Sequence, residues 1–356
     1  MNCITNTDTI IFDAKFNSEP AIISGYTKLI FSNYNLNKNL FEHYANNDFN
    51  DLEYEGSKFN QDISNLPSTL TLIIFGEDFN IDILNFPLSL THLTFGWNFN
   101  QNISKLPPNL AHLTFDYEFN QYVFKLPPNL AHLTFGHEFN QDVSTLPPNL
   151  VHLIFGFRFN QDVSKLPQRI THLTFGNDFN RDVSKLPPRI THLTFGDGFN
   201  QDVSKLPLGI THLTFGYCFN RNISNLPLGI THLTFGYCFK QHNNILSNIK
   251  YLKLNCNNSY IINSLPNSII ELELDYYFNL EINDLPTSIK KLTFHKNSKY
   301  NIDLNCLPDF IEELHLNINY KKRILHIPSN IKKIVCHKDY PYKDDFVMSN
   351  VKTYDK

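Results

Sequence analysis

The sequence lacks the features of proteins that bind polyanions or membranes. Its formal net charge is only −4 at pH 7, whereas general binders of nucleic acid or acidic membranes carry a strong basic excess. No run approaches the ~20 apolar residues of a membrane span. The first sixteen residues also lack the apolar segment of a secretory leader. We therefore expect a cytoplasmic chain with neither a nucleic-acid nor a membrane partner.

Motifs for catalysis and for metal or cofactor binding are also absent. There is no GxSxG, HExxH, P-loop or Gly-rich dinucleotide fingerprint. The six cysteines form no CxxC pair and have no Cys/His metal spacing, which favours reduced thiols. They stand at positions 3, 218, 238, 256, 306 and 336. The sequence thus predicts no enzyme, no catalytic residue and no cofactor.

What the chain does contain is a twenty-residue repeat. Phe-Asn opens nine copies, from residues 59–60 to residues 219–220, and a typical copy runs from Phe179 to Gly198. A fixed period this short is typical of a solenoid, in which each coil packs only on its neighbours. The copies are so similar that the repeat predicts the fold far better than the function.

Each copy has the pattern of one short strand and one non-helical return. In His192-Leu193-Thr194-Phe195, Leu and Phe point one way and His and Thr the other. We expect Gly196 to permit the turn that follows the strand, and the Leu-Pro step to fix an extended return. The predicted fold is a leucine-rich-repeat-like solenoid with a parallel β-sheet on one side, extended Pro-containing returns and little or no helix.

The repeat varies in regularity along the chain. Residues 59–239 are regular repeats. Residues 240–337 keep the same repeat phase with a degenerate sequence, and residues 338–356 form a patternless C-terminal tail. Residues 1–58 are interpreted as degenerate N-terminal repeats that cap one end, with an independent helical cap across 36–48 as the alternative. Terminal repeats must present a polar outer face, which explains their different composition.

Two kinds of column are expected inside the coils. The inward apolar positions are those of Val183, Leu186, Ile190, Leu193, Phe195 and Phe199 and their equivalents. The Asn after each opening Phe, from Asn60 to Asn220, is expected to turn inward, where its amide would satisfy backbone groups.

A column of histidines marks the outward side of the strands. It contains His92, His112, His132, His152, His172, His192, His212 and His232. Histidine is the commonest metal ligand, so His152, His172 and His192 are an alternative metal site. The column offers no carboxylate or thiolate at fixed spacing, and a structural ladder is the favoured interpretation, with no metal.

The two residues after Gly vary from copy to copy and give the candidate binding surface. The first of them supplies large aromatic or ring side chains, which are frequent at binding hot spots. The candidate residues are Trp97, Tyr117, His137, Phe157, Tyr217 and Tyr237. The equally weighted alternative is that these rings only cover the core. Tyr122 and Phe124 form a second irregular, apolar pair on the return side.

The sequence motif of the repeat resembles that of a known family. Leu-Pro-x-x-Ile-x-x-Leu-x-Phe is close to the shortest leucine-rich repeats, and Phe-Asn-x-x-Val/Ile followed by Leu-Pro is similar to the FNIP repeat of amoebae and their large DNA viruses. The resemblance is strong over 59–239 and weaker over about 7–340. It implies a protein-binding module without enzymatic activity. Some members carry an F-box that recruits a ubiquitin ligase, but residues 1–58 contain no recognisable one.

These observations favour a monomeric, non-enzymatic scaffold that binds another protein, whose identity the sequence leaves open. It would act in the cytoplasm, or in the host-cell cytoplasm if the chain is viral. The alternatives are an array that binds a metal or small ligand through the histidine column, and a substrate receptor in ubiquitin ligation.

Overall fold

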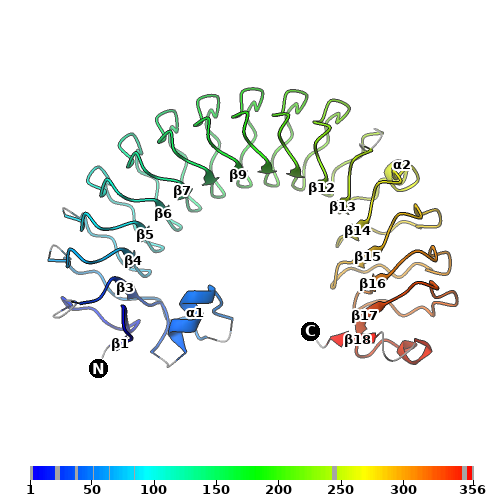
Figure 1. Ribbon diagram of the computed structural model, residues 1–356, viewed down its shortest axis with the longest axis horizontal. Helices are drawn as coiled ribbons and strands as arrows, with labels where there is room; N and C mark the ends of the chain where they lie inside the picture. Colours follow the sequence, from blue (N-terminus) through cyan, green and yellow to red (C-terminus); the bar gives the residue numbers. More distant parts are fainter. Residues whose placement is uncertain are drawn as a thin grey trace. The chain divides into compact units, whose positions relative to one another are not determined.

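Short strands recur about every twenty residues along most of the chain, and most of them are followed by a return without helix (Figure 1). The computed structural model describes residues 3–20, 25–36, 39–50, 52–63, 65–83, 85–242, 247–346 and 351–354. The chain divides into two units, Met1–Phe179 and Asn180–Lys356. Each unit is a parallel β-solenoid, which confirms the predicted fold.

The first unit contains nine of the described strands and one helix. Strand β1 pairs antiparallel with β2, and from β2 to β9 each strand pairs in parallel with the next. The elements are β1 (Cys3–Thr5), β2 (Thr9–Phe12), β3 (Lys28–Phe31), α1 (Leu40–Asn46), β4 (Leu72–Ile74), β5 (His92–Thr94), β6 (His112–Thr114), β7 (His132–Thr134), β8 (His152–Ile154) and β9 (His172–Thr174).

The second unit has the same plan, and its described strands β10 to β18 all pair in parallel with the next in sequence. Its elements are β10 (His192–Thr194), β11 (His212–Thr214), β12 (His232–Phe235), β13 (Tyr251–Leu254), α2 (Ser259–Ile262), β14 (Glu271–Leu274), β15 (Lys291–Phe294), β16 (Glu313–His315), β17 (Lys333–His337), the 3₁₀ helix η1 (Lys343–Asp345) and β18 (Val351–Tyr354).

The core of each coil is a stacked pair of phenylalanines. Phe155 and Phe159 have ring centroids 3.7 Å apart, and Phe155 lies 5.8 Å from Phe135 and 5.7 Å from Phe175 in the neighbouring coils. These rings are no more than 2% exposed. The inward columns expected from the sequence are confirmed, because Val183, Leu186, Ile190, Leu193, Phe195 and Phe199 are all buried. Burial of these side chains supplies the main driving force for folding.

The repeat glycines serve a different purpose from the one expected. Among the described glycines only Gly25 and Gly56 have positive φ, so the glycines of the regular coils are not needed for an unusual turn. They are needed because the backbones of adjacent coils approach closely. A Cβ on Gly156 would lie 1.9 Å from the carbonyl oxygen of Gly136.

The Asn column forms a ladder, although its side chains stay partly exposed instead of turning inward. The backbone N–H of Asn160 donates to Asn140 Oδ1 at 2.9 Å, and the Gln161 side chain donates to the same oxygen at 2.9 Å. Where the next coil supplies a Gln at this position, the amide oxygen thus receives two hydrogens. Asn200 differs, because Asn220 N–H donates to its Oδ1 while Arg221 donates to its backbone oxygen. The satisfaction of backbone groups is as expected, but it takes place at the surface of the return.

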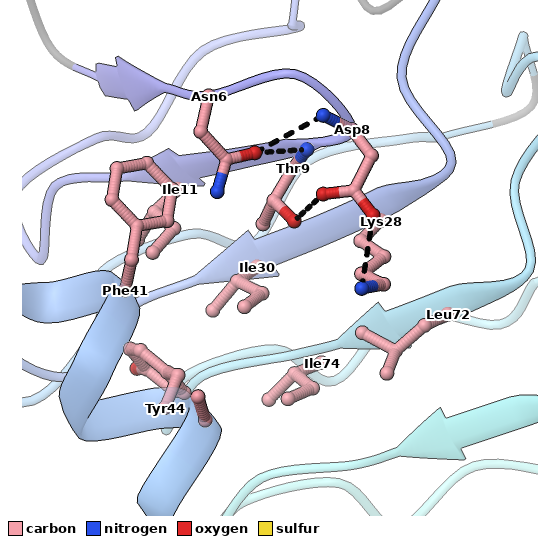
Figure 2. A pocket seen from close by; sticks show the side chains of 11 residues that line it. Asn6, Asp8, Thr9, Ile11, Lys28, Ile30, Phe41, Tyr44, Leu72 and Ile74 are labelled. Carbon is pink, nitrogen blue, oxygen red and sulfur yellow. Dashed lines mark hydrogen bonds and ion pairs between the residues drawn. The ribbon is translucent and has the colours of Figure 1, made fainter.

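Helix α1 lies in a long insertion within the coil of β3. Phe31 stacks on Phe59 at 3.7 Å, the same contact that Phe95 and Phe99 make only four residues apart. The residues between Phe31 and Phe59 therefore leave the coil and return to it. Within this insertion α1 packs over the outward side of the first strands, with Leu40 buried and Phe41 and Tyr44 facing the sheet (Figure 2).

The C-terminal segment is more regular than its sequence suggests. Residues 338–356 were expected to be patternless, yet β18 pairs in parallel with β17, and Tyr340 and Phe346 are buried with their rings 5.8 Å apart. The expectation failed because it considered the repeat wording alone. The last coil keeps aromatic residues in its core without keeping the Leu-Pro signature.

Truncation of a core ring should be far more damaging than truncation of a surface side chain in the next coil. Phe155→Ala should lower the free energy of unfolding by about 3–5 kcal/mol, because it leaves a cavity between stacked rings. Exposed Lys165 is the control, and Lys165→Ala should change stability by less than about 0.5 kcal/mol. Denaturant unfolding of both variants checks this, and equal losses would show that the inward assignment is wrong.

Candidate functional site

The candidate binding residues of the first unit occupy one position in four consecutive coils, just beyond the strand ends. We call Trp97, Tyr117, His137 and Phe157 the aromatic column. A backbone ladder fixes their register, since Glu118 N–H donates to Trp97 O and Glu138 N–H to Tyr117 O, both at 2.9 Å. Each ring is therefore held one coil above the previous one.

The four rings form one continuous stack. The centroid distances are 4.2 Å from Trp97 to Tyr117, 4.3 Å from Tyr117 to His137 and 4.8 Å from His137 to Phe157, with interplanar angles of 2°, 8° and 14°. Neighbouring rings cover each other's faces, so their edges are what solvent meets. Ring edges carry partial positive charge and favour acceptors and other aromatic faces.

The stack does not bury itself against the core. Trp97 is 41% exposed and Phe157 is 39% exposed, whereas the core phenylalanines of the same coils are almost fully buried. A ring whose main purpose was to cover the core would place its face, not its edge, over the strand ends. The stack is therefore both ordered and partly exposed to solvent.

Charged groups lie directly beside the aromatic column. His137 Nδ1 is 2.6 Å from Glu138 Oε1, and Arg158 Nε is 3.7 Å from the same oxygen. Arg158 also lies 3.9 Å from Asp178. Glu118 differs, because its exposed carboxylate has no partner among the residues that the structure describes. The column therefore has one carboxylate available to a partner.

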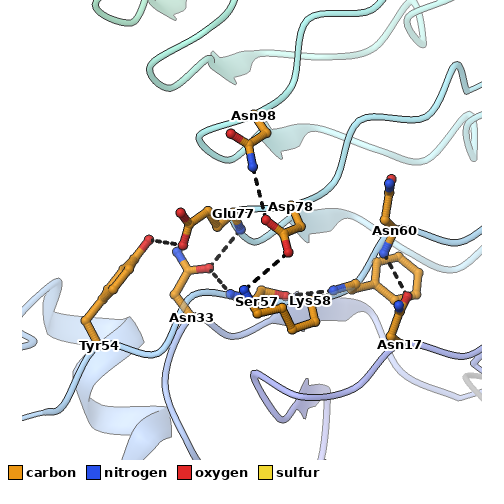
Figure 3. Close-up of polar contacts among 10 residues, drawn as sticks. Asn17, Asn33, Tyr54, Ser57, Lys58, Asn60, Glu77, Asp78 and Asn98 are labelled. Carbon is orange, nitrogen blue, oxygen red and sulfur yellow. Dashed lines mark hydrogen bonds and ion pairs between the residues drawn. The ribbon is translucent and has the colours of Figure 1, made fainter.

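In the coil that precedes the column, the two variable residues are Glu77 and Asp78, and both contact other residues of the chain (Figure 3). Asn33 Oδ1 accepts from the backbone N–H of Glu77 at 2.8 Å, and Tyr54 OH donates to the Glu77 carboxylate at 2.8 Å. Asp78 pairs with Lys58 at 3.4 Å and accepts from the Asn98 side chain at 3.0 Å. These internal contacts leave Trp97 as the first variable ring directed to solvent.

The candidate residues of the second unit form a separate cluster. Tyr217 and Tyr237 stack at 5.1 Å, and Tyr277 packs edge-on against both, at 6.2 and 4.8 Å. Sequence reasoning missed Tyr277, which stands at the second variable position of its coil, two residues after Asp275. Beside Tyr217 is an open depression of about 410 Å³, whose lining includes Lys253. Lys253 is held there by Glu273 at 2.8 Å and Asp275 at 3.0 Å.

The return side of the first unit carries the other irregular pair. Tyr122 and Phe124 are 68% and 59% exposed, with ring centroids 6.4 Å apart and tilted by 40°. They do not stack, and the cavity beside them measures only about 80 Å³. This pair is the alternative contact surface, though it is less ordered than the aromatic column.

The histidine column is a stacked ladder in each unit. From His92 to His172 the centroid distances between neighbouring rings are 4.1 to 4.4 Å. In the second unit His192, His212 and His232 stack at 4.1 and 4.0 Å. The rings lie on the outward side of the strands and are mostly half-buried by one another.

Threonines set the tautomer of several of these histidines. The Thr91 hydroxyl donates its single hydrogen to Thr71 O at 3.1 Å, and its oxygen lies 2.9 Å from His92 Nδ1. Nδ1 must therefore carry the proton in this contact, which leaves the Nε2 lone pair outward. The same pair of contacts recurs at Thr211 and His212.

A metal site needs lone pairs that converge on one point. The lone pairs of these parallel, stacked rings instead lie side by side. Within the described ranges, no group of three or more His, Cys, Asp or Glu side chains is arranged to hold a metal ion.

No helix in the described part of the chain is long and apolar enough to cross a membrane. The six cysteines are unbridged.

Comparison with known families identifies the repeat. The profile of the FNIP Repeat matches residues 59–98, 124–158, 142–178, 182–218, 199–238, 257–297 and 278–317. A search of curated proteins found no match.

Several solved structures are similar to this chain. One is described as CroV588, a novel circular leucine-rich-repeat protein, with 27% identity, a TM-score of 0.57 and coverage of 95% of this chain and 67% of that one. InlJ from Listeria monocytogenes is 13% identical, with a TM-score of 0.45 and coverage of 76% and 63%. YopM from Yersinia pestis is 19% identical, with a TM-score of 0.43 and coverage of 79% and 81%.

The histidine ladder should make stability depend on pH. Burial, followed by repulsion from neighbouring histidines, lowers the pKa of His112 to about 4, and burial lowers the pKa of His92, His132 and His172. A base with a lowered folded pKa stabilises the fold above its unfolded pKa of about 6.5. That contribution is lost as pH falls from about 6.5 towards 4, because only the unfolded chain then binds the protons.

We expect the melting temperature to fall over this range, and His112→Gln to reduce the slope. NMR titration of the imidazole signals checks the cause. Independent transitions near pH 6.5 for every ladder histidine would contradict the stacked arrangement.

Proposed function

This chain belongs to the FNIP repeat family, and we propose that it is a non-enzymatic scaffold that binds another protein through the aromatic column. Its solenoids resemble those of leucine-rich-repeat proteins, a fold typically used for protein interaction. The observation that carries the proposal is the continuous, half-exposed stack from Trp97 to Phe157.

Irregularity of the repeat supports the choice of this surface. Identical coils would offer a partner many equivalent registers, whereas one tryptophan and one ordered stack define a single register. The stack crosses four coils, or roughly 15 Å at the strand spacing. That length suits one hot-spot cluster, because hot spots gather rigid aromatic residues near the centre of an interface.

The exposed groups of the column also indicate which chemical groups its partner would carry. Exposed ring edges favour acceptor groups and apolar or aromatic side chains, and the unpaired Glu118 carboxylate favours a basic side chain close by. Because the rings already stack on one another, little side-chain entropy remains to be lost on binding. The partner is therefore a protein surface that combines an apolar patch with a lysine or arginine.

The proposal also covers the location of the chain, its oligomeric state and its second aromatic cluster. We place the chain in the cytoplasm, where its six thiols would remain reduced, and we treat it as a monomer without a cofactor. The Tyr217–Tyr237 cluster is a secondary contact surface, because its stack is shorter and Tyr277 already packs against both rings.

Truncation of both ends of the aromatic column should abolish binding without unfolding the protein. One hot-spot truncation costs about 2 kcal/mol or more, which is about thirtyfold in affinity. We expect Trp97→Ala combined with Phe157→Ala to lose the partner in affinity capture from cell lysate, quantified by mass spectrometry. The melting temperature should change little, because both side chains are partly exposed.

The matched control changes the other irregular pair to residues found in regular copies, as Tyr122→Asp with Phe124→Ser. This variant should capture the same partner as the unaltered chain, and Tyr217→Ala with Tyr237→Ala should weaken capture less than the column variant does. Normal capture by the column variant together with loss in the Tyr122/Phe124 variant would place the binding surface on the return side instead.

A further inference from the structure

The outward side of the strands changes its chemistry in the first coils. Strand register aligns Ile11 with Ile30, Ile30 with Ile74, and Ile74 with Thr94, the start of the polar Thr column. Leu72 likewise stands where His92 begins the histidine ladder. Three coils therefore present an apolar patch at the positions where the regular coils are polar. This change can be read from the sequence once the strand register is known.

Helix α1 covers this patch incompletely. Leu40 is fully buried against Ile11 and Ile30, with Phe41 and Tyr44 packed beside them. Between the helix and the strands remains a cavity of about 270 Å³. Figure 2 shows its apolar walls, formed by Ile11, Ile30, Ile74 and Phe41. An apolar cavity of ~150 Å³ can hold benzene, so this one has room for a substituted ring.

One end of the cavity is polar, and its groups have fixed orientations. Asn6 Oδ1 accepts the backbone N–H groups of Asp8 at 3.1 Å and Thr9 at 2.9 Å. The carboxamide therefore cannot turn round, and its Nδ2 points away from these bonds towards the space between Ile11 and Ile30 (Figure 2). Among the described residues, Nδ2 has no acceptor.

The neighbouring ion pair determines which head group fits. Asp8 accepts the Thr9 hydroxyl at 2.7 Å and pairs with Lys28 at 3.0 Å. These two hydrogen bonds, from Thr9 first and then Lys28, lower the pKa of the Asp8 carboxyl, so it is anionic at neutral pH. A second anion would be repelled by Asp8, and a cation would compete with Lys28. A neutral hydroxyl avoids both conflicts, because it can accept from Asn6 and donate to Asp8.

We propose that the cavity beneath α1 binds a small neutral phenol or alcohol, with its hydroxyl between Asn6 and Asp8 and its apolar body between Ile30, Ile74 and Phe41. This site lies on the strand side and is built from residues that the aromatic column does not use. Its function is therefore separate from the protein-binding surface.

The test uses the full chain, labelled at isoleucine δ1 methyl groups, and three probes of similar size. p-Cresol should shift the methyl signals of Ile11, Ile30 and Ile74. p-Xylene, which lacks the hydroxyl, should bind about fivefold more weakly, as expected for the loss of one hydrogen bond. 4-Methylbenzoate should bind more weakly still, because it brings a carboxylate beside Asp8.

Two variants locate the interaction. Asn6→Asp keeps the oxygen that accepts from Asp8 and Thr9 but loses the Nδ2 hydrogens, so it should abolish the preference for p-cresol over p-xylene. Ala45 of α1 lines the cavity and is accessible to solvent, and Ala45→Leu should fill the space and weaken both probes. Equal binding of p-cresol and p-xylene to the unaltered chain, tighter binding of 4-methylbenzoate, or shifts confined to other isoleucines would each overturn the proposal.

Discussion

Stacking of one coil on the next in unbroken register is the constraint on which everything else in each unit depends. The phenylalanine pair of one coil packs on that of its neighbours, as Phe155 does on Phe135 and Phe175. The glycines allow the backbones to approach until a single Cβ would collide with the next coil. A shift of one residue would bring outward polar side chains into this core, so the register is strongly specified.

Register converts a linear repeat into columns, and each column has a physical character of its own. Inward columns supply the hydrophobic core, the Asn column satisfies backbone N–H groups at the return, and the histidine column covers the outward side of the sheet. Such columns are structural because every coil contributes alike. Recognition needs a place where the coils differ, and we propose the aromatic column for this function because its rings form an ordered stack. The cavity beneath α1 is another, created where the outward columns become apolar and a helix covers them.

Much of the fold could be predicted from the sequence, because the repeat itself reports the strand phase and the buried positions, such as Leu193 and Phe195. The residues of the aromatic column were chosen as candidates from sequence variation, and their role in binding stays a prediction. Their face-to-face stacking was not predicted, because it depends on ring orientation between coils. The purpose of the glycines was missed because close approach is a property of pairs of coils. Strand β18 escaped prediction because its coil lacks the repeat sequence, and Tyr277 because its copy is degenerate. Helix α1 (Leu40–Asn46) falls within the helical cap across 36–48 that was predicted only as the alternative to degenerate repeats.

Equivalent residues of consecutive coils lie side by side in this fold, and Cys218 and Cys238 offer a direct chemical test of that register. They occupy the same position in adjacent coils, and the backbone N–H of Cys238 donates to Tyr217 O at 2.9 Å. Their Cα atoms should lie about 5 Å apart, within the range that a disulfide requires. Mild oxidation of the folded protein, followed by peptide mass spectrometry, should give one intramolecular Cys218–Cys238 bridge. Pairing of either cysteine with a different one, or no bridge between them in the folded state, would contradict the register.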